Sequence, residues 1–136
     1  MMLKTNRHRR TRRTGAALVE FAICLPVLVL IVLGSIEATS AVFVRQSLVV
    51  AAYEAAREAV RRDGDITEAR QRAENVLRLR NVKNATVTIT PTNLGSLKRG
   101  QDVKVEISTN TRANSPFFGR IVTDRRVSVS TTMVRE

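Results

Sequence analysis

The apolar positions of this chain gather in one long run near the amino terminus. Apolar character extends over residues 16–44, interrupted only by Glu20 and Glu37, and residues 21–36 carry no charge. A helix rises about 1.5 Å per residue, so a run of 29 residues would be about 43 Å long. The hydrocarbon core of a bilayer is only about 30 Å thick. The pattern therefore predicts a membrane-spanning helix over residues 16–44.

Beyond this run the spacing of apolar residues is helical and one-sided. Residues 45–62 contain neither Pro nor Gly and are rich in Ala, Glu and Arg, which are strong helix formers. Glu and Arg recur at i,i+3 and i,i+4 on the opposite face. We expect an extension of the first helix whose apolar stripe packs on its own domain, with contact to another subunit as the alternative. The stripe comprises Leu48, Ala52, Ala55, Ala56, Ala59 and Val60.

A second helix is predicted after a short break. Asp63-Gly64-Asp65 ends the first helix, and Gly64 suits the left-handed position after a last turn. Asp65 is placed to cap the next helix, with Glu68 three residues later as in a capping box, so we expect a helix from Asp65 to about Arg80. These acids do not fit an EF-hand calcium loop, which needs Gly at its sixth and Glu at its twelfth position. The apolar side of this helix comprises Ile66, Ala69, Ala73, Val76 and Leu77.

From Asn84 onward the apolar period changes from helical to two. Alternating apolar and polar residues predict half-buried strands near residues 85–89, 103–107 and 127–134, separated by turn-forming stretches rich in Gly, Pro and Asn. The expected fold class is α+β: a long N-terminal helix, then a short helix packed on a small three-stranded sheet, for which antiparallel pairing is favoured. Residues 63–136 number 74, a size at which isolated domains are marginal, so the first helix is expected to help cover the core.

Charge is concentrated at the amino terminus. The chain has 23 Lys and Arg against 12 Asp and Glu, and six of the cations but no acid lie in residues 1–15. Cationic flanks stay on the cytoplasmic side of a membrane helix, so we expect a single-pass membrane protein with its N-terminus in the cytoplasm and its C-terminus outside the cytoplasm. A basic tail could also bind nucleic acid. Topology already accounts for this tail and no aromatic residues interleave with a basic surface, so no nucleic-acid partner is expected.

Groups that could support catalysis are scarce. The sequence contains no Gly-rich phosphate loop and no GxSxG or HExxH motif. Its only histidine, His8, lies in the basic tail, and its only cysteine, Cys24, lies in the apolar run. One cysteine allows no intrachain disulfide and no Cys/His metal set. We therefore expect no enzyme activity, no cofactor and no metal site.

Three interpretations of the amino-terminal segment are open. A secretory signal would be cleaved after small residues such as Ala38 and Ser40, although the run exceeds the usual apolar region of roughly 7 to 15 residues. An uncleaved helix would be a simple membrane anchor. In the third interpretation cleavage follows Gly15, so that Ala16 begins the new chain and Glu20 becomes its fifth residue.

The third interpretation is supported by a resemblance. Gly15 is followed by Ala-Ala-Leu-Val-Glu-Phe-Ala, by Pro26, and by Gly-Ser-Ile-Glu over residues 34–37 where the apolar run ends. Residues 13–62 resemble the TadE-like minor pseudopilins of tight-adherence (Flp, type IVb) pilus systems. The class III signal peptide of such proteins is cut by a prepilin peptidase on the cytoplasmic side. Closely related pseudopilins share this helix signal, so the resemblance extends to them as well.

The resemblance implies an organisation and a function. It divides the chain into a leader cleaved after Gly15 (1–15), a transmembrane helix (16–44), an exported helix extension (45–62) and a small extracytoplasmic module (63–136). The implied role is assembly or priming of a tight-adherence pilus or type II-related secretion filament. Implied partners are membrane lipid, a prepilin peptidase, the major Flp-type pilin and other pseudopilins, an inner-membrane platform and its secretion ATPase. The alternative is a membrane-anchored extracytoplasmic binding or sensor domain without a filament role.

Two residues of the run are unusual in a membrane helix. A carboxylate such as that of Glu20 is costly inside a bilayer and is rarely left without a partner. By resemblance, Glu20 pairs with the amino terminus of a neighbouring subunit and sets the axial register; alternatively it snorkels to the headgroups or stays protonated. Pro26 lacks a backbone N–H and clashes with the preceding turn, so we expect a helix kink, either harmless or with a packing role.

The adjacent Phe117 and Phe118 lie in a predicted turn and make up two of the four Phe residues. Neighbouring side chains on a strand point to opposite faces, so both rings can be buried only in a loop. We expect both to pack beneath their own chain, with an exposed ring as a partner contact being the alternative.

Overall fold

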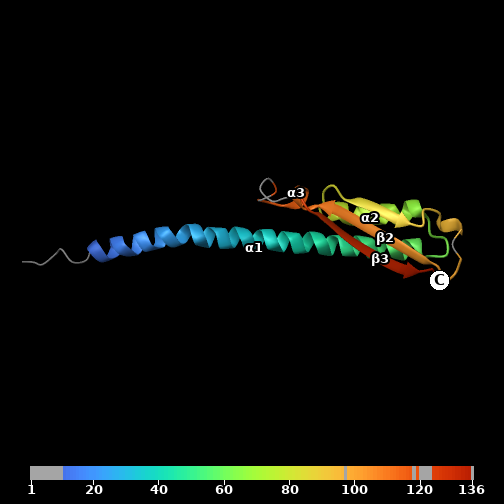
Figure 1. Ribbon diagram of the computed structural model, residues 1–136, viewed down its shortest axis with the longest axis horizontal. Helices are drawn as coiled ribbons and strands as arrows, with labels where there is room; N and C mark the ends of the chain where they lie inside the picture. The colour runs from blue at the N-terminus through green and yellow to red at the C-terminus, as the bar shows by residue number, and fades with distance from the viewer. Residues whose placement is uncertain (1–10, 97, 118, 120–123, 136) are drawn as a thin grey trace, which may run out of the picture. The chain divides into compact units, whose positions relative to one another are not determined.

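The computed structural model describes residues 11–135 except residues 97, 118 and 120–123 (Figure 1). Most of the predicted leader, and Phe118, therefore lie outside the described residues. The chain divides into two compact units, Met1–Ile36 and Glu37–Glu136. Each unit is described by itself.

The first helix, α1, spans Thr11–Ala59 and passes through both units. It contains Pro26, and it ends before the predicted boundary at residue 62. The last turn closes with Val60 N–H donating to the carbonyl of Ala56 at 3.0 Å, after which the chain turns toward the second helix. The predicted continuity of the apolar run and its extension is therefore confirmed.

The second helix, α2, spans Ile66–Leu79, close to the predicted range. Asp65 occupies the N-cap position with extended backbone angles, and its carbonyl accepts the first helical bond from Ala69 N–H at 3.0 Å. The Asp65 side chain makes no capping hydrogen bond, so the predicted capping box is wrong in its side-chain part. Glu68 still lies in the first turn, where an acid favours the helix dipole.

Gly64 is needed in the turn between the helices, but for a different reason from the predicted one. Its backbone is not among the positive-φ residues of the described chain. An added Cβ would instead lie 2.6 Å from the carbonyl oxygen of Glu58 and 2.9 Å from that of Ala59. The turn folds back onto the last carbonyls of α1, leaving room only for a hydrogen atom.

The remaining elements form the predicted three-stranded antiparallel sheet. The strands are β1 (Thr86–Thr90), β2 (Asp102–Asn110) and β3 (Arg126–Val134), in the order β1-β2-β3. A short 3-10 helix, η1 (Leu94–Ser96), lies between β1 and β2, and a single-turn helix, α3 (Thr111–Asn114), follows β2. The predicted α+β class is confirmed.

One face of the sheet is buried and the other is exposed. In β2, Val103, Val105 and Ile107 are fully buried, whereas Lys104 and Glu106 are exposed. The buried face is covered by α2 and by the part of α1 that follows Glu37, both of which contribute small side chains, as Figure 1 shows for their ribbons. The predicted stripe of α1 thus packs on its own domain. Its fully buried members are Leu48, Ala52, Ala55, Ala56 and Ala59. Ala51 of α1, which was not predicted, and Ala69 and Ala73 of α2 are also fully buried.

Glu58 departs from the predicted charged outer face of α1. Its side chain is largely buried, forms an ion pair with Arg61 at 2.9 Å and approaches Arg72 of α2 at 3.9 Å. The pairing with Arg61 at i,i+3 is as expected. Because Arg72 comes from α2, however, Glu58 links two helices instead of facing solvent alone.

Candidate functional site

The residues singled out in the sequence lie on α1 within the first unit. Gly15, Ala16, Glu20 and Pro26 are all exposed, and no described side chain from residue 15 to residue 36 is buried. The most apolar stretch of this helix has a mean hydropathy of 2.8, and the helix is long and apolar enough to cross a membrane. An apolar surface of this size must be covered by lipid or by other helices.

Gly15 has no steric reason to be glycine in this structure. It lies in the second turn of α1, and an added Cβ would meet nothing within 4 Å. Glycine in a helix costs roughly 1 kcal/mol relative to alanine. The residue therefore weakens the start of the helix without improving its packing.

Glu20 is an exposed carboxylate without a partner among the described residues. It lies four residues after Ala16, which is about 6 Å along the helix axis. Its neighbours in sequence, Val19 and Phe21, are 60% and 58% exposed, so the carboxylate lies on an uncovered apolar surface. A group that neutralises it must come from outside the described chain.

Pro26 lies inside α1, and the helix continues beyond it. Having no N–H, it cannot donate to the carbonyl of Ala22, one turn earlier. That carbonyl is available to a neighbouring helix, a hydroxyl or water, which is how membrane helices tolerate proline. The predicted kink stays a prediction.

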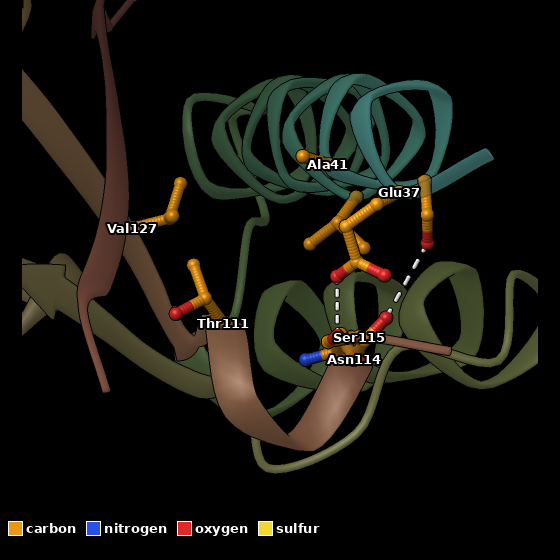
Figure 2. Close-up of a pocket in the computed structure, with 8 residues that line it drawn as sticks. Glu37, Ala41, Thr111, Asn114, Ser115 and Val127 are labelled. Atoms are coloured by element: carbon orange, nitrogen blue, oxygen red, sulfur yellow. Dashed lines mark hydrogen bonds between the residues drawn. The ribbon is translucent and has the colours of Figure 1, made fainter. Parts of the chain in front are cut away.

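A second cluster, at the start of the other unit, was not predicted from the sequence. Glu37 accepts a short hydrogen bond from the hydroxyl of Ser115 (Figure 2). Its other carboxylate oxygen lies 3.4 Å from the backbone N–H of Phe117. One turn further along α1, Ser40 Oγ donates to the carbonyl of Asn114 at 3.3 Å. Glu37, the first charged residue after residues 21–36, therefore binds the segment that follows α3.

Asn114 organises the rest of this junction. Its side-chain Nδ2 donates to the carbonyls of Lys83 at 3.1 Å and Asn110 at 3.0 Å, and to Thr109 Oγ1 at 3.1 Å. Its Oδ1 accepts the backbone N–H of Lys83 at 2.8 Å. The side-chain amide of Asn114 therefore connects the α2–β1 segment, the end of β2 and α3 by hydrogen bonds.

The cavity within this junction is small. It has a volume of about 50 Å³, and its apolar lining comes mainly from Ala41, Val44 and Val127 (Figure 2). Sites for drug-sized ligands are typically about 300 to 1,000 Å³, whereas a cavity of this size accommodates a few waters. This cavity is therefore too small to be a site for a drug-sized ligand. Among the described residues, no group of three His, Cys, Asp or Glu side chains could hold a metal.

The junction gives a prediction on stability. Replacing Asn114 by Ala removes several hydrogen bonds at once and leaves partly buried backbone groups unsatisfied, so we expect the free energy of unfolding to fall by roughly 2 to 3 kcal/mol. The measurement is the urea midpoint of proteolytic resistance of the full chain in detergent micelles. Asn75→Ala, at an exposed residue that bonds only Arg78, is the control and should change stability by less than about 0.5 kcal/mol. Equal effects of the two substitutions would contradict the role of Asn114.

Phe117 corrects the expectation that both rings pack beneath their own chain. Its side chain is 53% exposed, although its backbone is fixed by Glu37. The alternative of an exposed ring therefore holds for Phe117, while Phe118 lies outside the described residues. The sequence could not show this, because the residue that positions Phe117 lies 80 positions earlier in the chain.

Comparison with known proteins identifies the N-terminal segment. The family described as TadE-like protein matches residues 15–57, which are 43 of the 136 residues. No curated protein and no solved structure is significantly similar to the chain. The match begins at Gly15 and includes Glu20, Pro26 and Glu37, together with the first buried turns of α1 beyond Glu37. The N-terminal third of this chain is therefore similar to TadE-like proteins, as its sequence predicted.

Proposed function

We propose that this chain is a minor pseudopilin that is inserted in the bacterial cytoplasmic membrane, processed after Gly15, and active in assembling or priming a tight-adherence pilus. The observation that carries the proposal is Glu20, an exposed carboxylate that has no partner among the described residues and lies on an otherwise apolar helix surface. The TadE-like match over residues 15–57 supports the same role. The mechanism is assembly and not catalysis.

Membrane insertion follows from the surface of α1. Residues 21–36 are uncharged, and their side chains have no cover within the described chain. The basic residues that precede them keep the amino terminus in the cytoplasm and place the unit that begins at Glu37 on the other side. This is the topology that a cytoplasmic-side cut after Gly15 requires.

Processing creates the partner that Glu20 lacks. Cleavage after Gly15 gives Ala16 a free α-amino group, whose ordinary pKa of about 8 leaves it mostly cationic at neutral pH. In the filament this ammonium pairs with Glu20 of the adjacent subunit. Because an unpaired charge in an apolar bundle is costly, the pair favours one axial offset between neighbouring helices over all others.

The unit from Glu37 to Glu136 is the part that other subunits contact outside the membrane. Its core is closed by α1 itself, since the small side chains of the exported part of α1 are fully buried against α2 and the sheet. A displacement of the helix along the filament axis therefore carries the module with it. The proposed partners are the prepilin peptidase, the major Flp-type pilin and other pseudopilins, and the inner-membrane platform with its secretion ATPase.

The amino terminus of the mature protein tests the proposal. Full-length protein is expressed with and without a prepilin peptidase, extracted from membranes, and analysed by intact mass and terminal peptide mapping. We expect a chain that begins at Ala16 only where the peptidase is present. A start at Ala41 would indicate a secreted domain, and an intact Met1 in both samples would favour a simple membrane anchor.

A matched pair of glycine variants sharpens this experiment. Gly15 and Gly34 both lie in α1 with nothing within 4 Å of an added Cβ, so α1 accommodates a leucine at either position. Gly15→Leu is expected to abolish processing because the peptidase must read this residue, whereas Gly34→Leu should be processed normally. Equal processing of both variants would contradict cleavage at Gly15.

A further inference from the structure

One end of the Glu37–Glu136 unit lies where the apolar run of α1 ends. Glu37 is the first charged residue after the uncharged residues 21–36. It accepts hydrogen bonds from the hydroxyl of Ser115 and the backbone N–H of Phe117. Asn114 connects the same end to Lys83. We call this the proximal end and define it by Glu37, the α2–β1 connection, α3 and the start of β3.

The proximal end carries a surplus of exposed cations. Thr111 at the start of α3 exchanges hydrogen bonds with Arg125, and Asn110 is paired with Arg126 in the sheet, which brings these two arginines to the end that holds Lys83. Among the described residues, no ion pair engages any of the proximal cations. The exposed cations are Lys83, Arg112, Arg125 and Arg126.

The acids at the proximal end do not balance these cations. Glu37 is occupied by Ser115 and Phe117, and Asp124 accepts a hydrogen bond from Asn110 Nδ2 at 3.1 Å. The opposite end of the unit differs, because its cations alternate with acids in the α1–α2 turn and at the start of β2. Those residues are Arg61, Arg62, Lys98 and Arg99 with Asp63, Asp65, Glu68 and Asp102.

Apolar side chains are exposed beside the proximal cations. Phe117 is 53% exposed, and on α1 Val42 and Phe43 are 57% and 46% exposed, slightly beyond Glu37. Aromatic rings next to cationic side chains are typical of surfaces that lie at the boundary between lipid headgroups and acyl chains. The backbone N–H of Phe117 lies 3.4 Å from a Glu37 carboxylate oxygen, so Phe117 lies beside the first charged residue that follows the uncharged residues 21–36.

We propose that the proximal end docks on the bilayer that α1 spans, with Phe117 in the headgroup boundary and the four exposed cations on the phosphates of anionic phospholipids. The proposal rests on the membrane insertion of the proposed function but not on processing or a filament role. This contact holds the Glu37–Glu136 unit on the membrane surface as long as α1 stays in the bilayer. Extraction of α1 into a filament must break the contact.

Tryptophan reporters test this docking, because the chain contains no Trp. Full-length Phe117→Trp protein is reconstituted at one chain per nanodisc, in phosphatidylcholine alone or with three-tenths phosphatidylglycerol, and quenching by brominated acyl chains is measured. We expect strong quenching and a blue-shifted emission with the anionic lipid, at least twofold stronger than without it. Val134→Trp, at an exposed position at the opposite end of β3, is the matched control and should not be quenched.

Charge variants and a second reporter separate the possible outcomes. Arg112→Gln with Arg125→Gln should remove the lipid dependence in the Phe117→Trp background, whereas Lys98→Gln with Arg99→Gln, an equal change of charge at the other end, should not. Quenching that is independent of anionic lipid would overturn the phosphate contact. A response that appears only with several chains per disc would indicate a second copy as the partner and overturn the docking.

A separate reporter tests whether α1 is inserted in the membrane. A Trp placed at Leu28, which is 52% exposed in the apolar run, reports on the span itself. Quenching of Leu28→Trp without quenching of Phe117→Trp would overturn the docking and leave the membrane helix in place. Absence of quenching for Leu28→Trp would instead remove the membrane premise of the proposed function.

Discussion

Replacing Glu20 by Gln is expected to abolish filament production while the protein still inserts in the membrane and is cleaved after Gly15. The substitution keeps the size and shape of the side chain and removes only its charge, so helix packing is unchanged. It eliminates the partner of the neighbouring amino terminus, which is then left as an uncompensated charge between apolar helices. Burying such a charge costs several kcal/mol, which favours disassembly at every subunit contact. Pilus yield in a shear fraction, with membrane insertion and N-terminal mapping on the same cells, measures the effect.

Two further variants decide whether the charge of Glu20 or its mere presence matters. Glu20→Asp keeps the charge on a shorter side chain and should retain part of the filament yield. Glu106→Gln makes the same acid-to-amide change at an exposed strand residue, whose pair with Lys104 at 3.5 Å is accessible to solvent, and should leave the yield unchanged. A full filament yield from Glu20→Gln would contradict the pairing. Loss of insertion would assign Glu20 to its own chain instead.

The elements that the sequence predicted correctly are those determined by local periodicity. A continuous apolar run can only be covered by lipid or other helices, and residues 21–36 show no cover within the described chain. The strands alternate because successive side chains point to opposite faces, so Val103, Val105 and Ile107 were identifiable as a buried face before any partner strand was known. The helices and strands could therefore be derived from spacing alone, whereas the order of the strands in the sheet could not.

Contacts between distant residues were not predictable in this way. Glu37 and Ser115 are separated by 78 positions, and no periodicity links them. Glu58 was placed on an outer face because its neighbours are charged, yet Arg72 of α2 lies beside it. Such pairs depend on how the helices cross the sheet, which is a property of the packed core.

The predicted site differs from these contacts, because Glu20 has no partner among the described residues. The structure places Glu20 on an exposed surface and gives it no neighbour to neutralise it. If Glu20 acts by pairing with another molecule, the structure of a single subunit shows only a charged group that lacks a partner among the described residues. For this reason the Glu20 variants, and not the fold, decide the proposed mechanism.

Replacing Gly64 by Ala is expected to lower the stability of the Glu37–Glu136 unit substantially. An added Cβ would lie 2.6, 2.9 and 3.0 Å from the carbonyl oxygens of Glu58, Ala59 and Arg61. These atoms belong to backbone at the end of α1, so relief requires the turn to α2 to open and the hydrogen bond from Gly64 N–H to the Arg61 carbonyl, 3.0 Å long, to lengthen. Overpacking of this kind costs roughly 1 to 3 kcal/mol, and we expect the upper part of that range because no flexible side chain can move aside.

The sign of the change makes this test decisive. Where the backbone suits alanine, replacing glycine stabilises a protein by about 0.4 to 1 kcal/mol, because the unfolded chain loses freedom. Gly95 is the matched control, since an added Cβ there lies 3.4 Å from Asn93 Oδ1, an ordinary contact. Urea midpoints of proteolytic resistance in micelles should fall for Gly64→Ala and stay or rise for Gly95→Ala. A midpoint for Gly64→Ala at or above that of the unchanged protein would mean that the turn does not press on the end of α1, and that Gly64 instead serves only the flexibility of the connection to α2.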